Sequence, residues 1–163
     1  MDRPPSKDMI KLAEEAARMS PCVKSKRGVV AFADRTPYAG APSEAYLGRG
    51  YNGPPPRVTC LQTQECMDTC AKRCVHAESR AIREALRFKQ DRDVVSLLHV
   101  KINSEGVCVP GGPPSCWQCS RELLDVGFDG IWLCELSEGW VYYKAKEFHE
   151  ITSRNCGVAY GAV

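Results

Sequence analysis

Two short motifs in the sequence combine residue types that bind metal ions. His76 begins the sequence HAE at the head of an alanine-rich segment, and Cys116 and Cys119 enclose the sequence CWQC further along the chain. Each motif is weak alone, because a single histidine near a helix start is most often a surface or capping residue. Both motifs are predicted to open helices, where the helix dipoles would lower the pKa values of the two thiols. Together the three side chains favour a tetrahedral zinc site with its fourth position open to water.

An open position distinguishes a catalytic zinc site from a structural one. Zinc lowers the pKa of a bound water molecule to roughly 7, so hydroxide becomes available at neutral pH. Glu78 lies two residues after the histidine and is not needed as a ligand. We therefore expect Glu78 to be the catalytic residue, which takes a proton from this water and returns it to the substrate.

The overall composition limits the class of protein. A length of 163 residues fits one domain, spanning 1–163, with a single core. The net charge of +2, with acids and bases interleaved, does not by itself indicate nucleic acid or an anionic membrane as a partner. Residues 1–20 lack the apolar core of a signal peptide, so we expect a cytoplasmic protein that does not bind membranes. Ten cysteines in such a chain indicate metal binding rather than disulfides.

The residues around the motifs predict the elements that must position them. Periodic apolar residues predict helices, the first with Ser6 as its N-cap, at 6–20, 65–74, 75–89 and 116–128. Strands are predicted at 27–34, 44–53, 93–103 and 129–135, and a short strand leading into a closing helix at 139–152. A long polar connection is expected at 36–43, and three consecutive prolines make 53–60 irregular. The buried face of the helix at 75–89 is marked by Ala77, Ala81, Ile82, Ala85, Leu86 and Phe88. This order describes a layered α/β domain.

Three segments give the chain a resemblance to a known family. They are GYNGPPP at 50–56, CVHAESRAI at 74–82 and SCWQCS at 115–120. The combination of His, two Cys and a non-ligand Glu resembles the zinc-dependent nucleobase deaminases, and the segments resemble most the deoxycytidylate (dCMP) deaminases within the cytidine and deoxycytidylate deaminase superfamily. The resemblance covers roughly residues 12–135. It implies a three-layer α/β/α fold with a mixed five-stranded sheet, and a homo-oligomer that deaminates a cytosine nucleotide, dCMP to dUMP, with release of ammonia.

The same resemblance implies roles for residues around the substrate. Asn52 would contact the sugar of a bound nucleotide, and the backbone at Ala77 would contact the pyrimidine ring. Lys26 would lie near the phosphate, where the family has a basic residue just before the first strand. Lys24 and Arg27 compete for this role, and a solvated basic turn is the alternative interpretation.

A second group of cysteines is separate from the CWQC motif. Cys66 and Cys70 are four residues apart, so on a helix they share a face and can reach one metal ion. The resemblance to dCMP deaminases with a second, structural zinc implies Cys22, Cys60, Cys66 and Cys70 as its ligands, with Cys74 as an alternate. Four thiolates would close the site to water, and free thiols are the alternative. The remaining cysteines are expected to be small packed residues: Cys108, Cys134 and Cys156.

The chain departs from the family pattern at three positions near the substrate. Ser115 stands where the family has a proline directly before the first cysteine, so contact with the ring would fall to Ser115. Arg57 stands where an ungapped match has a glycine. Arg80 replaces an asparagine and could bind a phosphate, a different base or a polynucleotide backbone. We favour a salt bridge between Arg80 and Glu84, four residues away on the same helix.

Two other functions compete with deamination of a mononucleotide. The first is deamination of a base within single-stranded DNA or RNA, for which Trp140, Tyr142 and Tyr143 could stack a base. The near-neutral charge argues against it, because polynucleotide binding depends on phosphate neutralisation. The second is a non-catalytic, zinc-stabilised nucleotide-binding module. Glu78 argues against this module, since a purely structural site has no use for it.

Overall fold

The computed structural model describes residues 4–35 and 43–157, except for the side chains of residues 35, 43 and 70–72. The polar connection predicted at 36–43 lies outside the described residues, apart from Ser43, which begins a strand. Among the helices of the described part, none is long and apolar enough to span a membrane.

A mixed sheet forms the centre of the fold. Its main path has the order β2-β1-β3-β5-β6, made by β1 (Lys26–Arg35), β2 (Ser43–Tyr51), β3 (Val94–Ile102), β5 (Gly130–Glu135) and β6 (Gly139–Lys144). β3 and β5 run parallel, and the other neighbouring pairs on this path are antiparallel. The predicted mixed five-stranded sheet is therefore confirmed. A further strand, β4 (Cys108–Val109), pairs with the end of β3 and is too short for the sequence pattern to predict.

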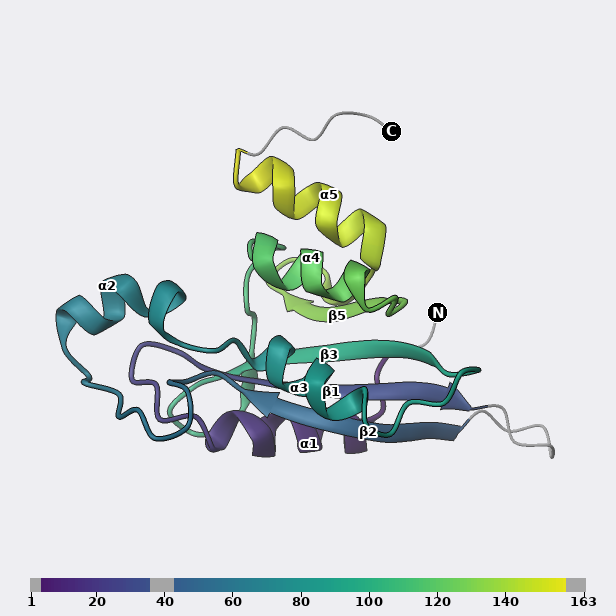
Figure 1. Ribbon diagram of the computed structural model, residues 1–163, viewed down its shortest axis with the longest axis horizontal. Coiled ribbons are helices and arrows are strands. Elements are labelled where there is room, and N and C mark those ends of the chain that lie inside the picture. The colour runs from purple at the N-terminus through teal and green to yellow at the C-terminus, as the bar shows by residue number, and fades with distance from the viewer. Residues whose placement is uncertain (1–3, 36–42, 158–163) are drawn as a thin grey trace.

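Helices cover both faces of this sheet (Figure 1). α1 (Lys7–Arg18) packs on one face, against residues that include Val30 and Leu98. The opposite face carries α3 (Ala77–Ala85), α4 (Trp117–Asp125) and α5 (Ala145–Asn155). α2 (Gln64–Arg73) lies beyond the ends of the strands. The predicted three-layer α/β/α arrangement is confirmed.

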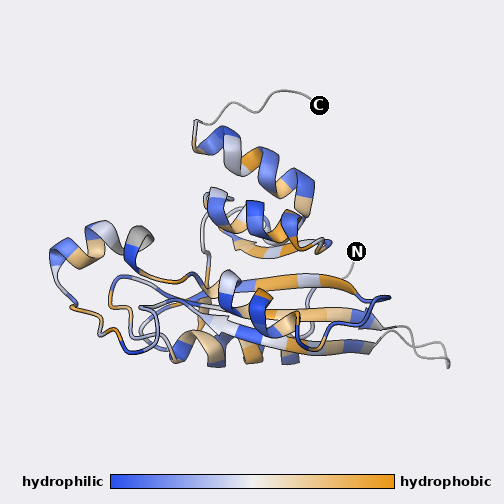
Figure 2. Cartoon of the chain, viewed as in Figure 1, coloured by the Kyte–Doolittle hydropathy of each residue, from blue (hydrophilic) through white to orange (hydrophobic). Residues whose placement is uncertain are grey.

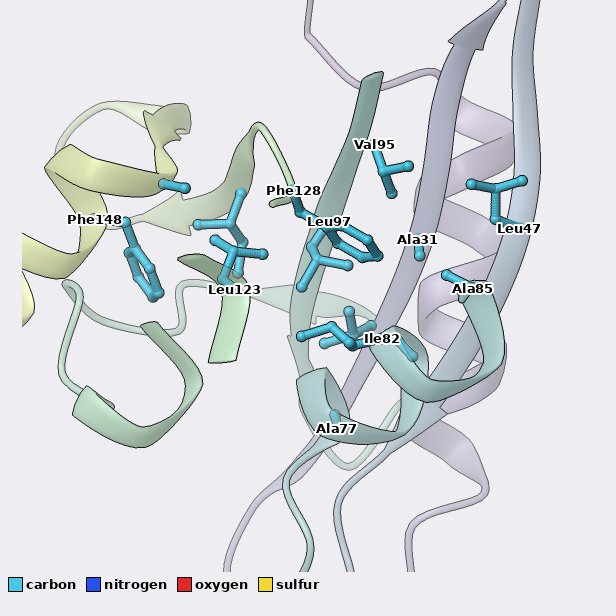
Figure 3. Packing of buried hydrophobic residues seen from close by; sticks show 14 of the residues in the cluster. Ala31, Leu47, Ala77, Ile82, Ala85, Val95, Leu97, Leu123, Phe128 and Phe148 are labelled. Atoms are coloured by element: carbon cyan, nitrogen blue, oxygen red, sulfur yellow. The ribbon is translucent and has the colours of Figure 1, made fainter. Parts of the chain in front are cut away.

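The two-residue period of the strands divides the core into two clusters. On β1 and β3, the odd-numbered residues Val29, Ala31, Val95 and Leu97 face α3 and its neighbours (Figure 3). The even-numbered residues face α1. Both strands are therefore buried on both sides, and Figure 2 shows them largely orange. A polar residue in phase with the first set will point toward α3.

The helix predicted at 75–89 is shorter than expected. His76 is its N-cap and the helix ends at Ala85 with Leu86 as its C-cap, so Phe88 lies past the helix and no longer follows its spacing onto the core. Leu86 and Phe88 are 48% and 61% exposed, and their assignment to the buried face was wrong. The other predicted helices form close to their expected bounds, and Ser6 caps α1 by accepting a hydrogen bond from the Met9 N–H at 3.3 Å.

Candidate active site

The three predicted metal ligands meet at the N-terminal ends of two helices. His76 caps α3, and Cys116 caps α4 by accepting a hydrogen bond from the Cys119 N–H through its sulfur. The His76 Nδ1 atom lies 3.2 Å from Cys116 Sγ and 3.1 Å from Cys119 Sγ, and the two sulfur atoms are 3.0 Å apart. A donor set of one imidazole and two thiols fits a tetrahedral zinc ion that retains one open position. Among the described residues, no other group of His, Cys, Asp or Glu brings three donors this close.

The two cysteines of this group differ in protonation. Hydrogen bonds from Cys119 and His76 outweigh burial and lower the pKa of the Cys116 thiol to about 5. The hydrogen bond with Cys116, together with burial, raises the pKa of Cys119, and the Glu78 charge adds to this effect. The hydrogen bond with Cys116 also raises the pKa of His76. Metal binding requires both cysteines as thiolates, so a bound cation must displace the proton of Cys119.

Glu78 lies beside this group in the first turn of α3. Its side chain is 12% exposed, and its Oε1 atom is 3.9 Å from His99 Nε2. Burial would raise the pKa of the Glu78 carboxyl, but the facing His99 ring, a backbone N–H and His76 together hold that pKa below its ordinary value. Glu78 is thus a buried carboxylate, close to the metal-ligand group but outside it, that is ionised at neutral pH.

A cavity of about 860 Å³ opens onto these residues. His76, Glu78 and Cys116 line it, as do three residues predicted to contact substrate: Asn52, Ala77 and Ser115. Its remaining wall includes the loop Gly111–Pro114 and the side chains of Trp117 and Phe148. The volume lies within the range of small-molecule sites in proteins.

Comparisons with known proteins give matches in structure but not in sequence. No protein-family model matches the chain, and no curated protein matches it. The dCMP deaminase from the cyanophage S-TIM5 in apo form superimposes with a TM-score of 0.53 and 17% identity, over 93% of this chain and 91% of that chain. A cytidine deaminase from Burkholderia pseudomallei superimposes with a TM-score of 0.53 and 15% identity, over 88% and 95% of the two chains. The phage enzyme in complex with dCMP and dUMP gives a TM-score of 0.51 at 19% identity, over 77% and 76%.

The chain has the cytidine deaminase fold. The predicted fold class is confirmed by this likeness, and identities below 20% carry it no further than the fold. The roles of individual residues in this deaminase fold must come from its own geometry.

Asn52 holds the chain at the entrance to β1. Its Oδ1 atom accepts a hydrogen bond from the Arg27 N–H at 2.8 Å, and its Nδ2 donates to the Ser25 carbonyl at 2.8 Å. The Asn52 backbone is bound as well, since the Ser20 hydroxyl donates to its carbonyl at 2.7 Å. A side-chain amide has two donors and two acceptor lone pairs, so one of each remains for a ligand in the cavity.

The prediction that Lys26 is the basic residue near the substrate needs correction. Lys26 is exposed and is not among the residues that line the cavity, whereas Lys24 and Arg27 both line it. The reason is strand alternation, because residue 27 is in phase with Val29 on the side of α3 and residue 26 is not. Of the three basic residues considered, Lys26 is thus the one that the fold directs away from the site.

His99 on β3 is a site residue that the sequence analysis missed. It is 5% exposed, lines the cavity and has its Nε2 atom 3.4 Å from Arg27 Nη1. Burial, reinforced by the Arg27 charge and opposed by Glu78, lowers its pKa to about 4, so the ring is neutral at neutral pH. The available signal was its phase, since His99 alternates with Val95 and Leu97, which face α3.

The segment before the CWQC motif is fixed by the end of α5. Pro114 is fully buried, and its carbonyl accepts a hydrogen bond from Asn155 Nδ2 at 2.8 Å. The Ser115 carbonyl accepts one from the Cys156 thiol at 3.2 Å. These contacts restrain the backbone just before Cys116, where the family pattern has a proline that this chain lacks.

The second cysteine group is only partly described. Cys60 Sγ and Cys66 Sγ lie 3.9 Å apart, while Cys22 and Cys74 line the cavity. The side chain of Cys70 lies outside the described part of the structure. The structure thus brings one predicted pair together, and the full ligand set of a structural zinc stays a prediction.

Arg80 does not form the predicted salt bridge with Glu84. Its guanidinium donates to the carbonyls of Tyr51 and Pro54, at 2.9 and 2.6 Å, and lies over the Tyr51 ring. Glu84 accepts a hydrogen bond from the Arg49 N–H instead. The prediction considered only pairing within one helix, whereas Arg80 faces the neighbouring loop and ties the proline-rich segment to α3.

Proposed function

We propose that this protein is a metal-dependent hydrolase that converts a cytosine nucleotide, dCMP, into dUMP and ammonia. The observation that carries the proposal is the buried Glu78 carboxylate beside a His76, Cys116 and Cys119 donor group in a cavity of about 860 Å³. A structural metal site has no use for such a carboxylate. The fold shared with a dCMP deaminase and a cytidine deaminase supports the same reaction class.

A zinc ion held by His76, Cys116 and Cys119 would supply a Lewis acid that lowers the pKa of a water molecule to roughly 7. Glu78 supplies the proton transfers. Its carboxylate accepts one proton from the attacking water and passes it to the ring nitrogen, then accepts the second from the hydroxyl now bonded to the pyrimidine carbon and passes it to the leaving amine. An ionised and buried Glu78 suits the first of these steps, because it must begin as a base.

The remaining polar groups of the cavity suit a nucleotide. The Ala77 N–H belongs to the first turn of α3, where backbone donors have no partner within the helix, and it can bind the pyrimidine carbonyl. The free donor and acceptor of Asn52 can bind the sugar. Lys24 and Arg27 provide the positive charge that a phosphate requires.

Two tyrosines considered for stacking a polynucleotide base have other partners. The Tyr142 hydroxyl donates to Asp129, and the Tyr143 hydroxyl donates to Glu135. The ring of Tyr142 also packs against Trp132, with centroids 5.0 Å apart. These contacts favour a mononucleotide over single-stranded DNA or RNA.

An ammonia-release screen of the zinc-loaded protein tests the proposal. The substrates are cytosine, cytidine, deoxycytidine, CMP, dCMP and a short cytosine-containing oligonucleotide. We expect dCMP to give the highest kcat/KM. The variant Glu78→Gln should lower kcat by roughly 10²- to 10⁴-fold at unchanged zinc content. Glu105→Gln, at an exposed glutamate outside the cavity lining, is the matched control and should retain activity.

Three outcomes would contradict the proposal. No ammonia from any of these compounds would exclude the deaminase and favour a nucleotide-binding module. Faster release from the oligonucleotide than from dCMP would transfer the activity to polynucleotides. Equal activity in Glu78→Gln and the unmodified protein would remove Glu78 from the reaction.

A further inference from the structure

His99 is a polar side chain in an otherwise apolar stretch of β3. Its neighbours Leu97, Leu98 and Val100 are at most 1% exposed, and His99 itself is 5% exposed. Burying an imidazole without partners costs free energy, so a buried histidine is expected to have polar contacts. The polar groups that face it across the cavity are the guanidinium of Arg27 and the carboxylate of Glu78.

The contact with Arg27 decides which nitrogen of the ring carries the proton. Arg27 Nη1 lies 3.4 Å from His99 Nε2, and a guanidinium can only donate. As a hydrogen bond, this contact requires Nε2 to accept, and the proton of the neutral ring then lies on Nδ1. In this state Nε2 gives no hydrogen bond to Glu78, whose Oε1 atom lies 3.9 Å away.

Neighbouring parts of the cavity wall contact both members of this pair. The Arg27 backbone is bound twice by Asn52, through its N–H at 2.8 Å and its carbonyl at 3.2 Å. The ring of His99 has the backbone of the 111–114 loop against it, since a Cβ at Gly111 would lie 3.5 Å from His99 Cε1 and 3.7 Å from Nδ1. The Arg27 backbone is therefore fixed by Asn52, and the His99 ring packs against the 111–114 loop.

We propose that the Arg27–His99 pair is a positioning device for Glu78, an inference that rests on the proposed deamination. The His99 ring is neutral and turns its Nε2 atom toward the Glu78 carboxylate. The hydrogen bond from Arg27 keeps this Nε2 atom unprotonated. Glu78 is thereby kept close to the His76, Cys116 and Cys119 group without a competing hydrogen bond from β3. His99 does not touch the substrate, so it acts through Glu78.

Variants at residue 99 test this role by kinetics. His99→Leu removes the polar edge at similar volume and should lower kcat roughly 10- to 100-fold, with KM little changed and zinc per chain unaltered. His99→Gln, whose amide reaches the former Nε2 position, should recover most of the loss. A fall in zinc content or thermal stability that accounts for the whole loss, or a kcat unchanged in His99→Leu, would overturn the proposal.

A second measurement does not depend on turnover. The chain has three histidines, so the ring nitrogens can be resolved by ¹⁵N NMR of the unmodified protein. We expect the His99 proton on Nδ1, and a mixture of tautomers in Arg27→Met. Lys26→Met, at an exposed position outside the cavity lining, is the matched control and should leave the tautomer unchanged. A proton on Nε2 in the unmodified protein would overturn the pair. An inactive protein with the expected tautomer would instead overturn the proposed reaction.

Discussion

Gly50 on β2 lies directly against the backbone of Ala77 at the start of α3. A Cβ atom at residue 50 would be 2.1 Å from the Ala77 carbonyl oxygen and 2.6 Å from the Ala81 nitrogen. Both contacts are with backbone, so no side chain can rotate away to make room. The absence of a side chain at Gly50 therefore sets how closely β2 approaches the turn that carries His76 and Glu78.

Gly50→Ala should consequently move the start of α3 and destabilise the protein. We expect a loss of about 1–3 kcal/mol in the free energy of unfolding, measured in urea. Weaker zinc binding should accompany it. The control is Gly111→Ala, where the nearest atom would be 3.5 Å away and stability should change by less than about 0.5 kcal/mol. Equal stability of both variants would contradict the close approach.

The ligand group could be predicted from sequence because its information is local. His76 and the two cysteines each open a helix, and the order of helices and strands then brings the helix starts together. The resemblance to the deaminase family placed Asn52, Ala77 and Ser115 near the substrate, and all three line the cavity. Short motifs at the ends of helices and strands were therefore enough to predict most of the site residues.

The residues that sequence reasoning misplaced depend on contacts between distant segments. Arg80 binds carbonyls of a loop more than twenty residues away, which no helical spacing can indicate. Lys26 was preferred over Arg27 although strand phase decides between them, and the phase becomes certain only once the register against β3 is known. His99 was hidden for the same reason, because one polar residue in an apolar strand has meaning only through its neighbours.

The bound metal should be required for activity and should also stabilise the fold. Dialysis against a chelator is expected to abolish ammonia release and lower Tm, and zinc should restore both. Cys116→Ser should retain less than about one zinc per chain at this site and be inactive. Cys108→Ser is the control, since Cys108 lies on β4 outside the cavity lining. Full activity of the chelated protein would contradict a metal site.

Asp129 should make the protein sensitive to acid. Burial would raise the pKa of Asp129, but hydrogen bonds from Tyr142 and Lys144 outweigh it and hold the pKa below the ordinary value of 3.8. A carboxyl whose pKa is lowered by folding stabilises the protein above pH 3.8, and this contribution is lost as the pH falls through the folded-state value.

Asp129→Asn should therefore be less stable than the unmodified protein by about 1 kcal/mol at pH 7, with the difference shrinking at lower pH. Urea unfolding at pH 7 and pH 3 measures this directly. Asp91→Asn, at an exposed aspartate, is the control. A difference that grows on acidification would show that the sign is wrong.

Arg57 occupies a backbone conformation that favours glycine. Its φ of 69° lies in the left-handed region. An ungapped match to the family pattern has a glycine at this position. A residue with a Cβ atom pays about 1 kcal/mol in that region, and glycine does not. We expect Arg57→Gly to be more stable than Arg57→Ala, the reverse of the usual order.

At Lys11, an exposed residue inside α1, the glycine variant should instead be less stable than the alanine variant by about 1 kcal/mol. Urea unfolding of the four variants checks both differences, and the same order at both positions would contradict the left-handed conformation at Arg57.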